Sequence, residues 1–182
     1  MKVGVVSDTH GYFDPSLALL FDGVKMILHA GDIGSDPVLP NLRSIAPVLA
    51  IRGNIDLKLP TREYPDWMIR NILGWRILIV HHLGKPDALQ EEVAELISAR
   101  HPHIVISGHS HKFSLAEQSR RIFLNPGSAG RKRFHLERSA AIMELEPGRL
   151  SITIRSLERS GFPAVCEWEG FSGALSNAFT TL

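Results

Sequence analysis

Short apolar runs, rich in valine and isoleucine, recur along the first two thirds of the chain and alternate with segments of helical character. This alternation is typical of parallel strands joined by crossover helices. The expected strands are Val3–Ser7, Met26–His29, Val48–Ile51, Ile77–Val80 and Ile104–Ser107. The clearest expected helix is Pro86–Arg100, which carries apolar residues at helical spacing, and Pro37–Ile45 is a weaker one. The sequence therefore predicts an α/β protein.

Other stretches predict antiparallel strands. The segment "IRNILGWRILIV", residues 69–80, predicts two strands around a turn at Leu73 and Gly74. After Ser110 the apolar runs become shorter and are broken by Gly and Pro, and strands are expected at Ile122–Leu124, Ala140–Leu145 and Leu150–Ile154. A chain of 182 residues suits a single domain.

Five of the expected strands share one property: each ends on residues able to bind a metal. These residues are Asp8 and His10 after "GVVS", Asp32 in "HAGD", Asn54 in "RGN", His81 in "IVHH", and His109 and His111 in "SGHSH". Each group alone is an ordinary polar turn. The carboxyl ends of parallel strands, however, lie along one edge of an open α/β sheet, so these residues are expected to converge there. Their recurrence at five strand ends predicts a metal site.

The types of ligand narrow the choice of metal. Oxygen and imidazole ligands without a nearby thiolate suit Mn²⁺, Fe²⁺, Co²⁺, Ni²⁺ or Zn²⁺ in a catalytic site. Seven candidate ligands exceed what one tetrahedral ion uses, so two ions sharing one carboxylate are expected. Gly31, Gly53 and Gly108 precede three of the ligands, and a residue without Cβ lets the backbone turn sharply beside an ion.

Charge and cysteine content exclude several other classes of protein. Lysine plus arginine (20) nearly balances aspartate plus glutamate (19), so no global charge draws the chain to nucleic acid or anionic lipid. Nucleic acid is therefore expected only as a small nucleotide substrate. The single cysteine, Cys166, forbids an internal disulfide framework and suits a reducing compartment. No apolar run is long enough for a signal-peptide core or a membrane span, so a soluble, cytoplasmic protein is expected.

The motifs "SDTHG", "HAGD", "RGNID", "VHH", "SGHSH" and "NPGS" occur in the order found in calcineurin-like metallophosphoesterases. The resemblance covers residues 1–157 and is closest to the small bacterial and archaeal phosphodiesterases, which are also similar to the retromer subunit Vps29. It implies a four-layer αββα sandwich, in which two mixed β-sheets pack face to face with helices outside, and a dinuclear metal site at one sheet edge.

Carried over to this chain, the resemblance places Asp8, His10 and His111 on one metal, Asn54, His81 and His109 on the other, and Asp32 between them. It makes Asp8, Asp32, Asn54 and His81 the expected catalytic residues. The implied activity is that of a phosphodiesterase acting on a small-molecule phosphoester, with a metal-bridging hydroxide attacking phosphorus in line. Two divalent ions are expected, Mn²⁺ first, with Fe, Ni, Co or Zn as alternatives.

One position departs from the better-known phosphatases of this superfamily, which have His after the Asn where this chain has Ile55. An isoleucine neither contacts phosphate nor donates a proton, and a missing general acid costs roughly 10²–10⁴-fold. Esters with good leaving groups are therefore the expected substrates. The alternative is a Vps29-like protein-binding scaffold with little or no catalysis. His82, which follows the expected ligand His81, is either close to the site or a polar strand end.

Residues outside the ligand motifs have simpler interpretations. His29 is expected in the core or behind the ligands, Asp56 is expected to fix a ligand loop, and the "NPGS" loop at residues 125–128 is expected to close the site. The basic loop 131–133 either contacts a phosphate or is solvated. Residues 158–182 form a C-terminal extension that either packs on the domain or makes an oligomer contact, on a helical stripe formed by Trp168, Phe171, Leu175 and Phe179.

Overall fold

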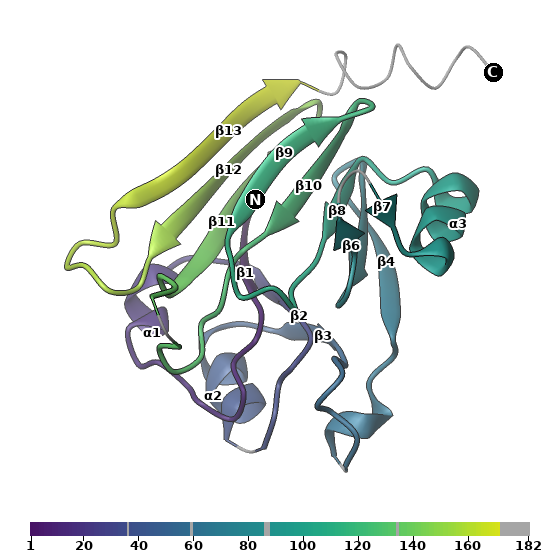
Figure 1. The fold of residues 1–182 in the computed structure, drawn as a ribbon. Helices are drawn as coiled ribbons and strands as arrows, with labels where there is room; N and C mark the ends of the chain where they lie inside the picture. The colour runs from purple at the N-terminus through teal and green to yellow at the C-terminus, as the bar shows by residue number, and fades with distance from the viewer. Residues whose placement is uncertain (36, 59, 86–87, 134, 172–182) are drawn as a thin grey trace.

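The computed structural model describes residues 1–35, 37–58, 60–85, 88–133 and 135–171. Two large mixed sheets pack face to face within this part of the chain (Figure 1). The larger sheet has six strands in the order β13-β12-β11-β1-β2-β3. Their bounds are β1 (Lys2–Val6), β2 (Met26–Ala30), β3 (Val48–Ile51), β11 (Ser139–Glu146), β12 (Arg149–Ser156) and β13 (Ala164–Phe171).

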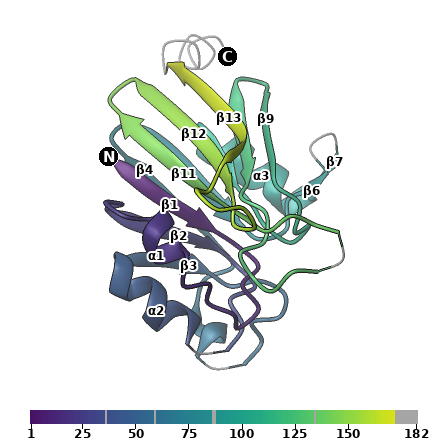
Figure 2. The same ribbon diagram turned by 90° about the vertical axis from the view of Figure 1, so that its left-hand side faces the viewer.

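Strands β1, β2 and β3 are parallel, whereas β11, β12 and β13 pair antiparallel with their neighbours. Figure 2 shows β13, β12, β11 and β1 side by side. The parallel half of the sheet therefore brings the carboxyl ends of β1, β2 and β3 to one edge.

The second sheet has five strands in the order β4-β5-β8-β10-β9. Its strands are β4 (Trp67–Ile72), β5 (Trp75–Val80), β8 (Ile104–Ile106), β9 (Ser114–Gln118) and β10 (Arg121–Asn125). Strand β8 is parallel to both β5 and β10, and β4 and β5 form the predicted hairpin around Leu73 and Gly74. The carboxyl ends of β5 and β8 thus also lie at one edge.

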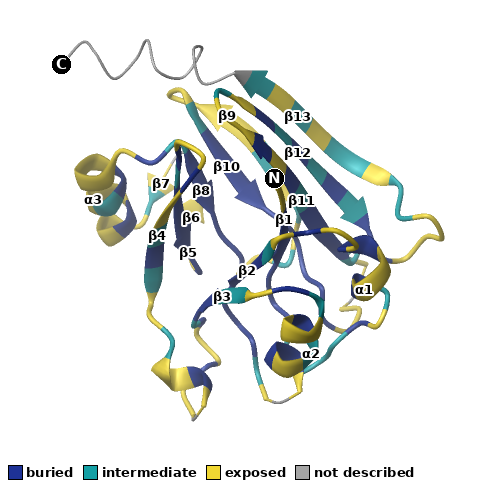
Figure 3. Cartoon of the chain, turned by 180° about the vertical axis from the view of Figure 1, so that it is seen from behind, coloured by how far each residue is buried: buried dark blue, intermediate teal, exposed yellow. Residues whose placement is uncertain are grey.

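Three apolar clusters give the molecule its layers. The largest lies between the sheets and includes Val5 and Leu28 from one sheet and Ile79 and Ile106 from the other. A second cluster joins the six-stranded sheet to α1 (Leu17–Leu20) and α2 (Val38–Ile45). The third joins the five-stranded sheet to α3 (Glu91–Arg100), and Figure 3 shows the helices with their exposed faces outward. The four-layer αββα arrangement is confirmed.

The structure corrects the expected helix Pro86–Arg100. The helix α3 begins only at Glu91, because β6 (Gly84–Lys85) and β7 (Ala88–Leu89) pair as a short antiparallel ladder just before it. Pro86 lies outside the described residues. A short 3₁₀ helix, η1 (Thr61–Glu63), lies between β3 and β4.

The expected helical stripe near the C-terminus is also wrong for the described residues. Trp168 lies on β13, which pairs antiparallel with β12 at the edge of the larger sheet. Val165, Cys166 and Trp168 pack against the cluster between the sheets. Leu175 and Phe179 lie outside the described residues. Among the helices of the described residues, none has the length and hydropathy needed to cross a membrane.

Candidate metal centre

All seven predicted ligands meet where the two sheets come together. Asp8 and His10 follow β1, Asp32 follows β2 and Asn54 follows β3, all from the six-stranded sheet. The five-stranded sheet contributes His81 after β5, and His109 and His111 after β8. The site is therefore built across both sheets, from the carboxyl ends of five strands.

One group of donor atoms comes from Asp8, His10, Asp32 and His111, and their ligand atoms lie within 4.8 Å of one another. The Nε2 atoms of His10 and His111 are 3.1 Å apart. His111 Nε2 also lies 3.4 Å from Asp8 Oδ1, and His10 Nε2 lies 3.5 Å from Asp32 Oδ2. Two imidazoles and two carboxylates therefore face one point.

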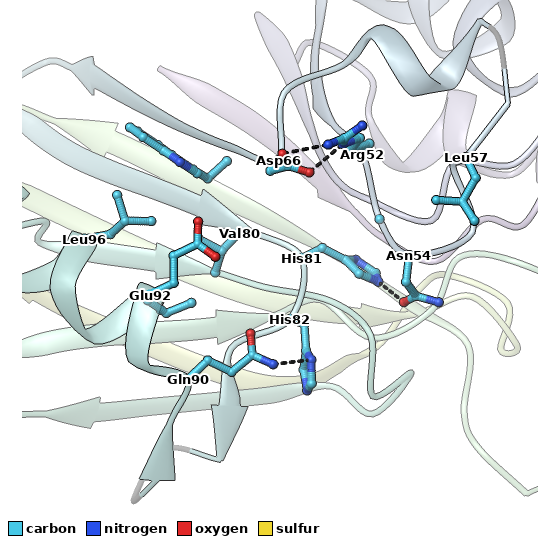
Figure 4. Close-up of a pocket in the computed structure, with 13 residues that line it drawn as sticks. Arg52, Asn54, Leu57, Asp66, Val80, His81, His82, Gln90, Glu92 and Leu96 are labelled. Atoms are coloured by element: carbon cyan, nitrogen blue, oxygen red, sulfur yellow. Dashed lines mark hydrogen bonds and ion pairs between the residues drawn. The ribbon is translucent and has the colours of Figure 1, made fainter.

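A second group of donor atoms adjoins the first. The Asn54 side-chain oxygen lies 3.1 Å from His81 Nε2 and 2.9 Å from His109 Nδ1. Figure 4 shows Asn54 and His81 directed toward each other. His81 Nε2 also lies 3.3 Å from Asp32 Oδ1. An amide oxygen, two imidazoles and a carboxylate oxygen thus form this group.

Asp32 belongs to both groups through different oxygens. Its Oδ2 is near His10, whereas its Oδ1 is near His81. The backbone N–H of Ile55 also donates a hydrogen bond of 3.1 Å to Oδ1. Only 2% of Asp32 is exposed, so this carboxylate is held between the two groups.

Burial keeps the two imidazoles of the first donor group unprotonated, which is the form that binds cations. Desolvation lowers the pKa of His111 to about 4, and His10 adds to this effect through like charge. Desolvation also lowers the pKa of His10, with help from the charge of Arg133. Both imidazoles are therefore neutral near pH 7 and have lone pairs to share. Burial raises the pKa of Asp8 to about 6, since nothing among the protein groups fully compensates its charge.

His81 is oriented by a main-chain contact behind it. Its Nδ1 donates to the carbonyl oxygen of Ala30 at 2.8 Å, which leaves Nε2 directed at Asn54 and Asp32. Such a backbone contact fixes the tautomer of histidines that ligate metals. Burial acts to lower the pKa of His81, but the bonds to Asp32 and Ala30 outweigh it and raise the pKa above its ordinary value.

The backbone is strained at most of these residues. Five of the seven have positive φ: Asp8 (54°), His10 (48°), Asp32 (52°), His109 (68°) and His111 (58°). This left-handed region is uncommon for residues other than glycine and clusters at functional sites. Main-chain hydrogen bonds hold it in place, such as His10 N–H to Asp32 O at 3.0 Å and Gly108 N–H to His81 O at 3.0 Å.

The glycines that precede the ligands allow close approach, as predicted. A Cβ on Gly31 would lie 2.6 Å from His81 Nδ1, and one on Gly53 would overlap Asp32 Oδ1. At Gly108 the added atom would overlap the Ser7 hydroxyl. These positions have no room for a side chain without displacing a donor group.

Asp56 fixes two ligand loops. Its carboxylate accepts hydrogen bonds from the backbone N–H groups of Ile33 (3.0 Å), Gly34 (2.8 Å) and Gly53 (2.8 Å). Two of these groups follow Asp32 and the third precedes Asn54. The carboxylate therefore ties the ends of β2 and β3 together.

The "NPGS" loop supports the ligand loops from behind. The Asn125 side-chain amide donates to Gly108 O at 2.7 Å, and the Ser128 hydroxyl donates to Asp8 O at 2.8 Å. His29 is fully buried, and its Nε2 lies 2.9 Å from the Thr9 hydroxyl. Thr9 in turn donates to Ile33 O at 2.9 Å. His29 thus lies behind the loops rather than among the donor atoms.

Two other sequence features lie beside the donor groups. His82 is exposed, its ring centre is 4.0 Å from that of His109, and its Nδ1 accepts a 2.6 Å hydrogen bond from the Gln90 amide. In the basic loop, Arg131 stands 5.2 Å from the centre of the Tyr12 ring, and Lys132 pairs with Glu158 at 2.7 Å.

The donor chemistry fits divalent transition metals. Imidazole nitrogens and carboxylate and amide oxygens converge, and the described residues place no thiol among them. Asp8, buried without a full counter-charge, is the kind of carboxylate that a cation stabilises. A shared carboxylate between two donor groups is the arrangement expected for a pair of ions.

Sequence reasoning missed a cavity of about 370 Å³ next to the second donor group. Asn54 and His81 line it, together with residues of β4 and α3 that include Trp67, Glu92 and Leu96. No motif marks these residues, because they come together only when α3 packs on the five-stranded sheet.

The calcineurin-like phosphoesterase superfamily domain matches residues 1–148. A probable metallophosphoesterase from Methanothermobacter thermautotrophicus is 32% identical over 133 residues, which cover 70% of this chain and 77% of that protein. Vps29 from Entamoeba histolytica, solved with Zn²⁺, has the same fold with a TM-score of 0.75 at 22% identity, covering 93% of this chain and 99% of that one. A phosphoesterase from E. coli superimposes with a TM-score of 0.65 at 19% identity, covering 92% and 98%. The chain belongs to the calcineurin-like phosphoesterase superfamily.

Proposed function

We propose that the protein is a dinuclear metal-dependent phosphodiesterase acting on a small-molecule phosphoester. The observation that carries the proposal is the position of Asp32, whose two carboxylate oxygens face two separate groups of donor atoms. Asp8, His10 and His111 would hold one ion, Asn54, His81 and His109 would hold the other, and Asp32 would serve both. Manganese is the preferred metal, because mixed oxygen and imidazole donors suit borderline cations.

When bound, two such ions would supply activation of water and would offset negative charge at the phosphoryl group. The protein's own residues hold and orient this centre. The Ala30 carbonyl fixes His81, and the His109 N–H donates to both oxygens of Asp8 at 3.1 Å. Asn54 lines the cavity, and we assign to its side-chain NH₂ the role of orienting a phosphoryl oxygen.

Activity toward diesters is the expected specificity. Ile55, 41% exposed, stands next to Asn54 and donates no proton to a leaving group, so esters with good leaving groups are favoured. Beside the site, a cavity is available for the organic group of the ester.

The test is hydrolysis of bis(4-nitrophenyl) phosphate and of 4-nitrophenyl phosphate by the full chain, first stripped of metal and then loaded with Mn²⁺. We expect turnover only with metal, and higher kcat/KM for the diester. The variant Asp32→Asn, prepared in the same way, controls for a contaminating phosphatase. Unchanged turnover after chelation, verified by metal analysis, contradicts the mechanism.

A second candidate function is that of a Vps29-like protein-binding scaffold. Ile55 in place of a proton donor favours it, and Vps29 shares the fold. Metal binding without turnover of any phosphoester in the test above would support this candidate.

A further inference from the structure

The cavity beside the second donor group has the chemistry of a substrate pocket. Asn54 and His81 belong both to the cavity lining and to the donor group. Figure 4 shows these two residues at one end of the cavity and Leu96 and Glu92 toward the other. A phosphoester held at Asn54 and His81 therefore has its organic group beside Leu96 and Glu92. The volume of the cavity, about 370 Å³, falls within the range of small-molecule sites, roughly 300–1,000 Å³.

Apolar side chains form much of the lining. They come from the Asn54 loop, from β4 and β5, and from α3: Leu57, Trp67, Val80, Val93 and Leu96. Leu57 is 69% exposed. The Arg100 guanidinium stands 5.8 Å from the centre of the Trp67 ring and helps to hold it. An aromatic ring bound among these groups would be removed from water.

The charges of the lining disfavour an anionic organic group. Arg52 is the one lysine or arginine among the described lining residues, and Asp66 holds it through hydrogen bonds of 2.5 and 2.8 Å. None of the described lining residues forms an ion pair with the exposed carboxylate of Glu92. Two carboxylates thus face the cavity with one cation, and that cation is already paired.

The polar groups near Glu92 accept hydrogen bonds. The Gln90 amide nitrogen donates to His82 Nδ1 at 2.6 Å, so the Gln90 oxygen is left as an acceptor. Figure 4 shows this oxygen on the side of Glu92, away from His82. A ring with N–H or O–H groups on its edge would meet two acceptors here.

We propose that this cavity receives an uncharged aromatic ring of the phosphodiester substrate, with hydrogen-bond donors on the ring edge facing Glu92 and Gln90. A nucleobase with an amino group has this chemistry. The inference rests on the proposed function, because it is the phosphoester at Asn54 and His81 that directs the ring into the cavity.

The first test compares two monoanionic diesters that differ only in their organic groups, diphenyl phosphate and dimethyl phosphate. Binding to the Mn²⁺-loaded full chain is measured by calorimetry, so the result does not depend on turnover. We expect diphenyl phosphate to bind about tenfold more tightly, since ring burial is worth at least that factor. Equal dissociation constants for the two diesters would overturn the proposal.

Two leucine variants locate the preference. Leu96→Ala removes a cavity side chain at the expected position of the ring, and Leu19→Ala removes one that is exposed (74%) and lies on α1, outside the lining. We expect the preference for diphenyl phosphate to fall about threefold in the first variant and to persist in the second. An equal effect of the two substitutions would also contradict the proposal.

Charge reversal on α3 supplies the second test. Glu92 lines the cavity, whereas Glu95 is exposed on the same helix and does not. For the wild type we expect affinity to decrease from bis(4-aminophenyl) phosphate through diphenyl phosphate to bis(4-carboxyphenyl) phosphate. Glu92→Lys should tighten the carboxylate ester by about fivefold, and Glu95→Lys should leave it within about twofold, because screening weakens more distant charges. The same change in both variants would show that the ring does not lie beside Glu92.

The outcomes separate this inference from the proposed function. Turnover of bis(4-nitrophenyl) phosphate together with indifference to the ring overturns the cavity proposal alone. Absence of turnover together with ring- and Glu92-dependent binding overturns the catalytic proposal and supports the cavity as a ligand site.

Discussion

The Nε2 atoms of His10 and His111 lie 3.1 Å apart in the candidate metal centre. At this distance the two nitrogens share at most one proton, and burial lowers the pKa of both rings. When both rings carry their proton on Nδ1, a divalent cation can be coordinated by both Nε2 lone pairs at once. The pair is therefore a feature that metal binding explains.

We expect Asp32→Asn to lose both ions, whereas His111→Ala loses one. Asp32 faces both donor groups, and an amide is a weaker ligand than a carboxylate, so the change weakens the bridge. Metal content per chain after dialysis against Mn²⁺, measured by mass spectrometry of the digested protein, checks this. Two ions in Asp32→Asn would show that Asp32 is not the bridge.

Replacing Asp56 should lower stability and loosen two ligand loops together. Asp56→Asn weakens three backbone hydrogen bonds to a buried carboxylate, and we expect a loss of about 1.5–3 kcal/mol in the free energy of unfolding. Urea unfolding of the metal-free protein measures it. Asp22→Asn makes the same change of charge at an exposed position and is the control. It should leave the free energy of unfolding nearly unchanged. A loss no larger than that of the control would contradict the anchoring role.

Acid should unfold the metal-free protein partly through His29. Burial lowers the pKa of this fully buried ring to about 3, so between pH 6.5 and 3 the unfolded chain binds a proton that the folded chain does not. The free energy of unfolding therefore falls as the pH drops through this window, by up to about 1.4 kcal/mol per pH unit for one proton. In His29→Leu this part of the slope should disappear. Urea unfolding at several pH values in excess chelator gives both slopes, and identical slopes would refute the role of His29.

Restoring an imidazole at Ile55 should change selectivity among leaving groups. We expect Ile55→His to raise kcat/KM for alkyl phosphate diesters more than for 4-nitrophenyl diesters, because only poor leaving groups need a proton as the bond breaks. Both ester series and the metal content are measured on one preparation. An equal gain for both series in a fully metallated variant would reject this explanation.

That these residues lie close together could be predicted from the sequence, because their positions follow from the topology. Any residue at the carboxyl end of β1, β2 or β3 must lie at the same sheet edge, whatever the details of packing. The glycines before Asp32, Asn54 and His109 belong to the same argument, since close approach there is visible from the residue type alone.

Two predictions of secondary structure were wrong because the local sequence pattern fitted more than one element. The spacing of Trp168 and Phe171 suggested a helix, but Glu167 and Glu169 alternate with Trp168 as in a half-buried strand, and pairing with β12 decides the outcome. Pro86 suggested an early start of the helix, whereas the ladder between β6 and β7 delays the start of α3 to Glu91.

The cavity was beyond sequence reasoning for a different reason. Its lining joins the Asn54 loop to Trp67 on β4 and to Glu92 and Leu96 on α3. Such a combination depends on how one helix packs against one sheet, and no spacing in the chain encodes it.

The left-handed backbone at Asp8, His10, Asp32, His109 and His111 bears on how this sequence evolves. Glycine adopts this conformation freely, whereas other residues are held in it at roughly 1–2 kcal/mol each. In a lineage that no longer used the centre, mutations to glycine at these positions would relieve the strain, and selection for folding alone would favour them. Glycine at any one of the five positions would therefore relieve backbone strain and remove a donor atom at the same time.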